Sequence, residues 1–439
     1  DPDDFKAALR EELSADLAEF LADSERIVFR TDEPPVISVL IVLWNKAHFT
    51  LRCLRSLQAQ QAEVPLEIII VDNASSDETG QLLERVDGAK ILRNPTNEGF
   101  LLATNRAAEM ATGKYLLLLN NDAFPRPGAI SVALETLRSA PDIGAVGALL
   151  ILPSGLVQEA GSLVWNDGST YGYGRGMPPE CGEVRFRRDV TYCSGAFLLT
   201  PRDRWEALRG FDEAFAPAYY EDTDYCMRLQ EQGLRVVFEP GAIVDHYELG
   251  SQAKSGDAVE ASLRNRGYFY ERHSAMIERL PRPELHDALP ARDQIAGRSK
   301  RLLIVDDLLP LRENGSGMPR LQAIITAAIK AGWSVTCYMM SDPEVDWEKL
   351  WTELPAGVEI IADRGPTALG DFLQERAGHY RAILVSRPHN MPAFWAAVGS
   401  HPRALGHARV IYDAEAIFTT REIVRNAIDG IKVDSTRAD

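Results

Sequence analysis

Short apolar runs rich in valine, isoleucine and leucine alternate with amphipathic stretches over the first third of the chain. Such runs predict strands, and apolar residues spaced three to four positions apart predict helices. The strands are expected at 36–45, 66–77, 89–95 and in the leucine run that begins at 116, and the helices at 50–61, 78–86 and 100–111. Strands that alternate with helices in short cycles favour a parallel, doubly wound sheet.

An amphipathic helix is expected ahead of this pattern, over 3–21, where a leucine or phenylalanine recurs every four residues. Its apolar stripe predicts docking onto the domain that follows. We assign 1–34 to this helix and its lead-in, and 35–279 to a first α/β domain.

The pattern changes from about residue 140, where glycine and aromatic residues become frequent. A strand is expected at 190–200, and helices are expected at 201–209, from 221 and at 257–273. This half of the first domain is therefore predicted to be a mixed α/β structure, with loops that suit a substrate site.

A second α/β domain is expected at 300–439, after a polar, proline-bearing linker at 280–299. It opens with a predicted strand at 300–307, a glycine-containing loop and a helix at 318–331. Further apolar runs with helices between them predict a Rossmann-like sheet.

Composition narrows the class of protein. A chain of 439 residues is long enough for two or three domains. The formal net charge of −17 argues against nucleic acid as a partner, because phosphate binding needs a basic surface. The five cysteines lie far apart without a Cys-x-x-Cys pair, which suits a reducing compartment. With no signal peptide or membrane-length apolar run in view, we expect a cytoplasmic protein.

Polar side chains stand where several predicted strands end. Asn45, Asp72 and Asp122 hold such positions, and ligands of doubly wound sheets bind at the carboxyl ends of the strands. The leucine run ends in Asn120, Asn121 and Asp122, three side chains that a core cannot use. The simplest alternative is an Asx-type turn that closes the strand.

Seven motifs, taken together, carry a resemblance over about 36–273. They are "SVLIVLWN", "EIIIVDNASSD", "RNPTNEGFLLATN", "LLLLNNDAFPRPG", "CSGAFLLTPRDRWEALRGFDEAF", "YYEDTDYCMRL" and "IVDHYELGS". In this order they resemble the family-2 glycosyltransferases with the GT-A fold, particularly the rhamnosyltransferase-like branch. Each motif alone is weak, and the series is specific.

The resemblance implies transfer of a sugar, with rhamnose as one candidate, from a dTDP-, UDP- or GDP-linked donor to a hydroxyl group. The acceptor is expected to be a growing bacterial surface glycan such as O-antigen, free or lipid-linked. A lipid-linked acceptor would bring the protein to the inner face of the membrane. The diphosphate leaving group develops negative charge, so Mg²⁺ or Mn²⁺ is expected as cofactor.

The resemblance places the metal at Asp122, which stands in the family's Asp-x-Asp motif. The chain departs from that motif at Asn120, whose amide can bond a hydroxyl group but brings no charge. His246 is the expected second metal ligand, and the alternative is a histidine that merely caps a strand. Asn120 and Asn121 are assigned to the nucleotide sugar.

The nucleotide is expected to contact further residues at the strand ends. Asp72 would accept a hydrogen bond from the base, and Asn45 belongs to the same edge. Asn97 and Asn105 flank the start of a helix whose N-terminal amides could face the phosphates, although Asn97 could equally be an N-cap. Asp77 is expected to cap a helix.

The motif "YYEDTDYCMRL" is expected to supply the base that removes the acceptor hydroxyl's proton. Its position in the motif assigns this role to Asp222, with Glu221 binding the acceptor or supporting the base. One base without a nucleophile implies a single displacement and an inverted product. The alternative is that Glu221, Asp222 and Asp224 only decorate a helix N-terminus, where acidic side chains are favoured.

The second domain has the glycine loop "NGSGMPR" after its first predicted strand and "VIYDAEAIFTTRE" near its end. With these features it resembles, more weakly, the N-terminal half of a GT-B glycosyltransferase of the family-4 type, over about 300–430. In such enzymes the C-terminal half holds most of the nucleotide sugar, so this domain is not expected to transfer sugar alone. Two other functions remain open for the chain. A nucleotidyltransferase would need a basic, glycine-rich signature that "LWNKAHFT" lacks. A carbohydrate- or nucleotide-binding scaffold would follow if Asn120 abolished metal binding.

Overall fold

The computed structural model describes residues 2–30, 33–248, 256–284, 288–295, 300–341, 343–414 and 428. The chain forms two compact units. The first comprises Asp1–Glu180 and Arg187–Ala296, and the second comprises Cys181–Phe186 and Gly297–Asp439. Helix α9 (Ala288–Ile295) occupies part of the stretch predicted as a linker. Across the described residues, no helix has both the length and the apolar character that a bilayer span requires.

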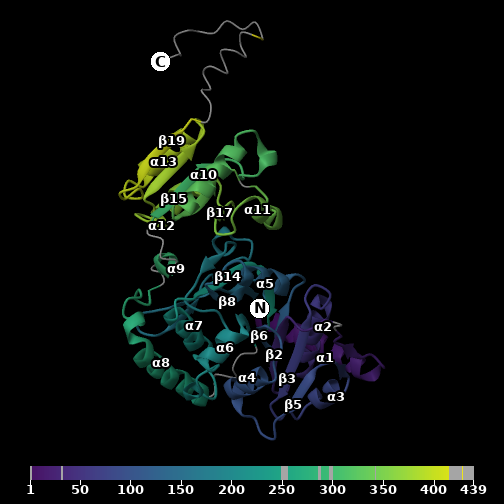
Figure 1. The fold of residues 1–439 in the computed structure, drawn as a ribbon. Helices are drawn as coiled ribbons and strands as arrows, with labels where there is room; N and C mark the ends of the chain where they lie inside the picture. Colours follow the sequence, from purple (N-terminus) through teal and green to yellow (C-terminus); the bar gives the residue numbers. More distant parts are fainter. Residues whose placement is uncertain are drawn as a thin grey trace. The chain divides into compact units, whose positions relative to one another are not determined.

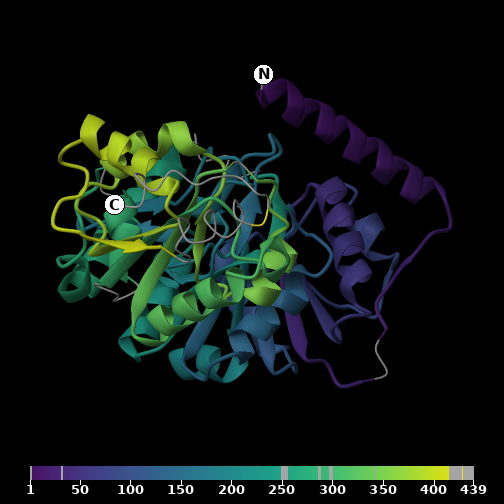
Figure 2. The ribbon, with the colours of Figure 1, turned by 90° about the horizontal axis from the view of Figure 1, so that it is seen from above.

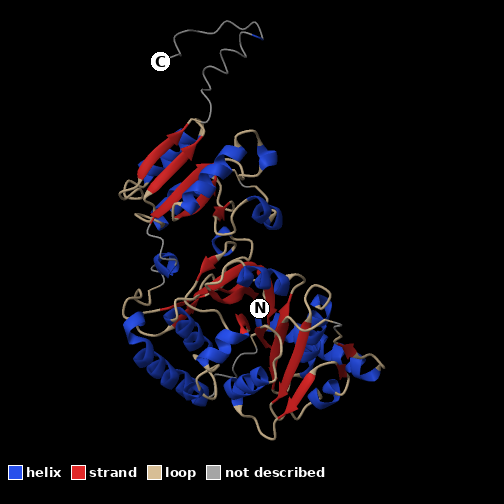
Figure 3. Ribbon diagram, in the orientation of Figure 1, coloured by secondary structure: helices blue, strands red, loops and turns tan. Residues whose placement is uncertain are grey.

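The first unit contains a mixed sheet (Figures 1 and 3). Its strands are β2 (Ile37–Leu43), β3 (Leu66–Asp72), β5 (Lys90–Arg93), β6 (Tyr115–Asn120), β7 (Ala123–Pro125), β8 (Ile143–Ile151), β9 (Val157–Ala160), β12 (Arg188–Asp189), β13 (Phe197–Pro201) and β14 (Arg235–His246). They follow the order β12-β14-β8-β13-β6-β2-β3-β5, with β7 paired to β14 and β9 paired to β8. Two short pairs lie outside this sheet, β1 (Ile27–Val28) with β4 (Val86–Asp87) and β10 (Ser162–Val164) with β11 (Thr170–Gly172).

The direction of the strands changes along this sheet. Strands β5, β3, β2 and β6 are parallel, which confirms the arrangement predicted for the first third of the chain. Strand β13 runs antiparallel to both β6 and β8, and β14 runs parallel to β8. The mixed second half is therefore also confirmed.

Helices flank this sheet. They are α2 (Ala47–Gln60), α3 (Thr79–Leu83), α4 (Gly99–Glu109), α5 (Ala129–Arg138), α6 (Arg202–Leu208), α7 (Glu221–Glu231) and α8 (Gly256–Ile277). Leu117 and Leu119 share a core cluster with Leu54 of α2 and Ala133 of α5. Successive side chains of a strand point to opposite faces of the sheet, so a run of leucines has to be packed on both faces. All four side chains of Leu116–Leu119 are inaccessible to solvent, which explains why apolar and polar residues do not alternate along this strand.

The N-terminal helix α1 (Pro2–Ala22) lies beside α2 (Figure 2). Leu17 and Phe20 join the core of the first unit, and Arg55 of α2 pairs with Asp16 at 2.6 Å. The predicted docking of this helix is confirmed.

The strand predicted at 190–200 is shorter, because only Phe197–Pro201 belongs to β13. The N–H groups of Ser194 and Gly195, just before it, donate to the side chains of Glu159 and Asp222 instead of a neighbouring strand. This departure from the sheet opens the site described below.

The second unit has its own parallel sheet. Its strands are β15 (Lys300–Asp306), β16 (Trp333–Met339), β17 (Glu359–Ile361), β18 (Ala382–Ser386) and β19 (Arg409–Asp413), and its helices are α10 (Met318–Lys330), α11 (Trp347–Glu353), α12 (Leu369–Glu375) and α13 (Asn390–Ser400). The order β17-β16-β15-β18-β19 is that of a Rossmann-like sheet. It confirms the predicted strands and the Rossmann-like fold of this unit.

Candidate active site

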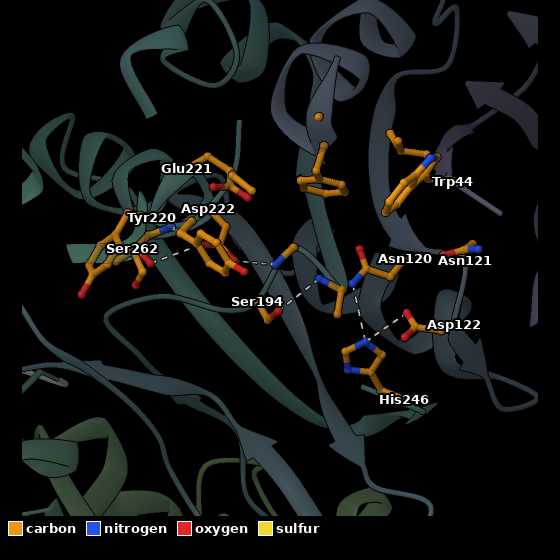
Figure 4. Close-up of a pocket in the computed structure, with 18 of the residues that line it drawn as sticks. Trp44, Asn120, Asn121, Asp122, Ser194, Tyr220, Glu221, Asp222, His246 and Ser262 are labelled. Carbon is orange, nitrogen blue, oxygen red and sulfur yellow. Dashed lines mark hydrogen bonds and ion pairs between the residues drawn. The ribbon is translucent and has the colours of Figure 1, made fainter. Parts of the chain in front are cut away.

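A pocket of about 620 Å³ lies in the first unit, beside the carboxyl ends of β2 and β6. Its ionisable lining includes Lys46, Asp122, Glu159, Glu221, Asp222 and His246. In Figure 4, Asn120, Asn121, Asp122 and His246 form one side of the pocket, and Tyr220, Glu221 and Asp222 form the other, with Ser194 between them. The pocket therefore brings together two groups of residues that the sequence analysis treated separately, the expected metal and donor residues and the expected catalytic acids.

Asp122 and His246 meet through a short antiparallel pairing. Ala123 of β7 is the register partner of His246, and the N–H of Tyr247 donates to the carbonyl oxygen of Asp122 at 2.9 Å. This pairing leaves Oδ1 of Asp122 3.3 Å from Nε2 of His246, with both side chains buried. A strand pairing, rather than a local turn, thus assembles the pair.

The imidazole of His246 is held in a defined orientation. Its Nδ1 lies 2.8 Å from the amide oxygen of Gln158, and Asn120 Nδ2 lies 3.5 Å from its Nε2. Because an amide oxygen only accepts, Nδ1 of the neutral ring carries the proton. Nε2 is then the ring nitrogen that faces Asp122 and the pocket, and a cation bound there would take its lone pair.

This pair fits a divalent cation of the Mg²⁺ or Mn²⁺ type. An octahedral ion with ligands at about 2.1 Å holds adjacent ligands about 3.0 Å apart, close to the observed spacing of the two side chains. Among the described residues, no cluster of three or more histidine, cysteine, aspartate or glutamate side chains suits a metal. Asp122 and His246 would thus leave most coordination positions to water and ligand oxygens.

Asp222 stands at the start of α7, on the far side of the pocket. Its Oδ2 accepts the N–H of Gly195 at 2.9 Å, and its Oδ1 accepts the N–H of Thr223 at 2.7 Å. Burial raises the pKa of Asp222, and these N–H groups act against that rise by stabilising the carboxylate. The group is therefore ordered and basic, as proton removal from a hydroxyl requires.

Glu221 differs from its neighbour. It is 6% exposed, and its Oε2 has no hydrogen-bond partner. Burial, followed by the charge of Asp222, raises the pKa of Glu221 to about 8. A lone buried carboxyl oxygen at the pocket wall is a ready partner for a hydroxyl group.

The sequence reasoning missed Glu159, a third carboxyl group of the pocket. It lies on β9, and its Oε1 accepts the N–H of Ser194 at 3.1 Å. Burial raises the pKa of Glu159 to about 7. The glutamate in "VQEAG" gave no local signal, because only the packing of β9 brings it to the pocket. Trp44 and Lys46, just after β2, are two further pocket residues that the sequence reasoning did not select.

The turn before α7 is strained and tightly held. Tyr219 and Tyr220 both have positive φ angles, 78° and 72°, which side chains with a Cβ seldom adopt. The amide nitrogen of Asn265, on α8, donates to the carbonyl oxygens of Phe215, Ala218 and Tyr219, at 2.7, 2.9 and 3.0 Å. This clamp supports the turn that presents Glu221 and Asp222 to the pocket.

Asp224 lies outside the pocket. It is inaccessible to solvent and pairs with Arg228 at 2.7 Å and with Nε2 of His273 at 2.9 Å. It therefore ties α7 to α8, while the two preceding acids face the cavity.

The structure does not bring all predicted nucleotide residues into this pocket. Asn97 lines it, and its side chain also accepts the N–H of Gly99, the first residue of α4, although Glu98 holds the N-cap position. Asp72 accepts the N–H of Ser75 in the turn after β3, and Asn45 accepts the N–H of Ser76. Neither side chain is part of the pocket lining.

Asn105 lies outside the pocket lining. Its side chain accepts the N–H of Phe211 and donates to the carbonyl oxygen of the same residue, each at 2.9 Å. It thereby fastens α4 to the loop after α6 and does not line the pocket. Asp77, by contrast, caps two helices as expected, because it accepts the N–H groups of Ala47 and Thr79.

Comparison with known proteins shows what part of this chain is similar to. A family model described as "Glycosyl transferase family 2" matches residues 38–174. An O-antigen biosynthesis protein, RfbC of Myxococcus xanthus, is 29% identical over 245 residues, covering 53% of this chain and 19% of that protein. The chain thus spans about a fifth of that relative.

A second relative is matched over nearly its whole length. The N-acetylglucosaminyl-diphospho-decaprenol L-rhamnosyltransferase of Mycobacterium tuberculosis is 27% identical over 290 residues, covering 60% of this chain and 94% of that protein. Among solved structures, GalNAc-T7 with UDP, GalNAc and Mn²⁺ is similar with a TM-score of 0.42 and 13% identity, over 69% of this chain and 58% of that one. The chain carries a glycosyltransferase family 2 domain with rhamnosyltransferase and O-antigen relatives.

Proposed function

We propose that the first unit is a metal-dependent, inverting glycosyltransferase of the GT-A type. It transfers a sugar, with rhamnose the first to test, from a dTDP-, UDP- or GDP-linked donor to a hydroxyl of a bacterial surface glycan. The observation that carries this proposal is one pocket with the Asp122–His246 pair on one side and Asp222 on the other. The family 2 match and the rhamnosyltransferase relative support the choice of reaction.

Asp122 and His246 would hold the cation, which would neutralise the charge that develops on the leaving diphosphate. Lys46 lines the same pocket and adds a cationic side chain near Asp122, where phosphate oxygens would lie. Asn120 and Asn121 lack charge, so their amides suit hydroxyl groups of the donor. One Asn121 donor already bonds Thr50 at 3.1 Å, which fixes its orientation.

Asp222 takes the proton of the acceptor hydroxyl at a carboxylate oxygen while that hydroxyl attacks the anomeric carbon. The glycosidic bond forms as the bond to the diphosphate breaks, so the configuration inverts. Glu221 and Glu159, which hold their protons to higher pH, would bond sugar hydroxyls without adding full charges beside Asp222. A lipid-linked acceptor would bring the protein to the membrane face.

The test is release of nucleoside diphosphate from dTDP-, UDP- and GDP-sugars by the full chain, with Mn²⁺ or Mg²⁺ and glycan acceptors. Asp122→Ala should abolish release. The matched control is Asp142→Ala, since Asp142 forms an exposed ion pair with Arg235 outside the pocket. Wild-type protein that turns over no donor under any of these conditions would contradict the proposal.

A second candidate rests on Asn120, because the missing charge weakens any metal site. In that case the unit would bind nucleotide or carbohydrate without turnover. Saturable binding of a nucleotide sugar, with no product released, would favour this scaffold function. For the second unit, we propose the N-terminal half of a GT-B fold that transfers no sugar alone.

A further inference from the structure

A β-bulge interrupts the pairing of β8 with β9 at Gln158. Ile151 pairs with Val157 and Leu150 pairs with Glu159, so Gln158 has no register partner. Bulges re-aim side chains and occur often beside active sites. Here the bulge lets two consecutive residues serve one site, because Glu159 lines the pocket and Gln158 contacts His246.

The contacts of Gln158 define which way its amide points. Its oxygen lies 2.8 Å from Nδ1 of His246, and its nitrogen lies 3.4 Å from a carboxylate oxygen of Glu248. That carboxylate is itself paired with Arg175 at 2.8 Å. Since only the amide nitrogen can donate to Glu248, the oxygen is left for the imidazole. Gln158 is also 9% exposed, so water has little access to replace it.

We propose that Gln158 is a positioning residue that presents Nε2 of His246 to the metal, and this rests on the proposed metal-dependent function. By accepting from Nδ1, the amide oxygen fixes the ring orientation and keeps the lone pair on the nitrogen that faces Asp122. Partners of this kind behind a ligand typically change metal affinity by about 10–100-fold when removed. The loss of metal affinity should be large in this protein, because Asn120 adds no charge to the metal site.

The experiment uses the full chain and Mn²⁺ as probe, with UDP, GDP and dTDP each present in turn. Electron paramagnetic resonance of free Mn²⁺ measures the affinity. Gln158→Met keeps the length of the side chain but removes the acceptor. Gln158→Glu restores an acceptor and is made together with Glu248→Gln, because the amide nitrogen of Gln158 now lies 3.4 Å from the Glu248 carboxylate. Gln230→Met is the matched control, because Gln230 bonds the carbonyl oxygen of Thr191 in the same unit and does not line the pocket.

We expect Gln158→Met to weaken Mn²⁺ binding about 10–100-fold, with Gln158→Glu and Gln230→Met within about 3-fold of wild type. Wild-type affinity in Gln158→Met would overturn the inference, while loss of binding in His246→Ala would leave the proposed function standing.

If wild type binds no Mn²⁺ with any nucleotide, both the inference about Gln158 and the proposed metal-dependent function are contradicted. Should Gln158→Met fail to fold, a loss of 10-fold or more in folded Gln158→Glu would overturn the inference, and retained binding would support it.

Discussion

Glu159 and Asp222 are held at neighbouring positions by one stretch of backbone, since the consecutive N–H groups of Ser194 and Gly195 donate to them at 3.1 Å and 2.9 Å. Two buried carboxyl groups so placed disfavour each other's ionisation. The pKa of Glu159 is raised to about 7, chiefly by burial, with the charge of Asp222 contributing. This arrangement gives the pocket one carboxylate that accepts a proton and a neighbour that retains its own near neutral pH.

Asp222→Asn should lower turnover by about 10²–10⁴-fold, the usual contribution of a general base. Donor and metal binding should change little, because the proton moves only in the transition state. Single-turnover kinetics and donor titration measure the two effects, and Asp142→Asn is the control. NMR of the product should show an inverted anomeric centre. Retention of configuration, or wild-type turnover in Asp222→Asn, would contradict the assigned base.

Chelation should abolish activity, and Mg²⁺ or Mn²⁺ should restore it, because the diphosphate leaves into an acidic pocket. Asp122→Ala should both stop turnover and weaken binding of the nucleoside diphosphate in the presence of metal. Activity assays and calorimetry with excess chelator provide the measurement. Full activity without any divalent cation would rule out the metal assignment.

Glu221→Gln should stabilise the protein at pH 8 and leave its stability nearly unchanged at pH 5. Burial raises the pKa of Glu221 to about 8, so the folded protein keeps a proton that the unfolded chain releases above about pH 4.5. The contribution of this group to stability is therefore complete at low pH and is lost as the pH rises towards 8. Glutamine mimics the protonated form. Thermal unfolding at both pH values tests this, with the exposed Glu135→Gln as control. Equal melting temperatures of wild type and variant at pH 8 would count against it.

Asn105→Ala should destabilise the first unit by about 1–3 kcal/mol, because it leaves the N–H and C=O of Phe211 without their partner. Nucleoside diphosphate binding should stay within about 2-fold of wild type at temperatures where the variant is folded. Denaturant unfolding and calorimetry measure the two quantities. A large loss of nucleotide affinity with unchanged stability would restore the donor-binding role that the motif suggested.

In the full chain, Asp222→Asn should leave no second, metal-independent transfer activity, because the second unit is proposed to be half of a GT-B fold. Product formation with each nucleotide sugar, in the presence of chelator, measures this. Any donor turnover that survives both the substitution and chelation would assign an active site to the second unit.

The strands and their polar ends could be predicted from local patterns of residues. The leucine run before Asn120 is one example, and the acids at the start of α7 are another. Both could be recognised because hydrophobic periodicity and residue preferences at helix ends are local properties of the chain. Asp122, His246 and Asp222 were selected because the motifs that hold them resemble those of a known family, and the structure brings all three to one pocket.

Which side chains meet depends on contacts between distant parts of the chain. Asn120 and His246 are 126 positions apart in the chain, and their approach depends on the pairing of β7 with β14. Glu159 reaches the pocket through β9, and the adjacent bulge directs Gln158 to His246. Conversely, Asn105 belongs to a matching motif, yet packing turns it towards Phe211. Such contacts depend on long-range register and on burial, which a local pattern of residues does not encode.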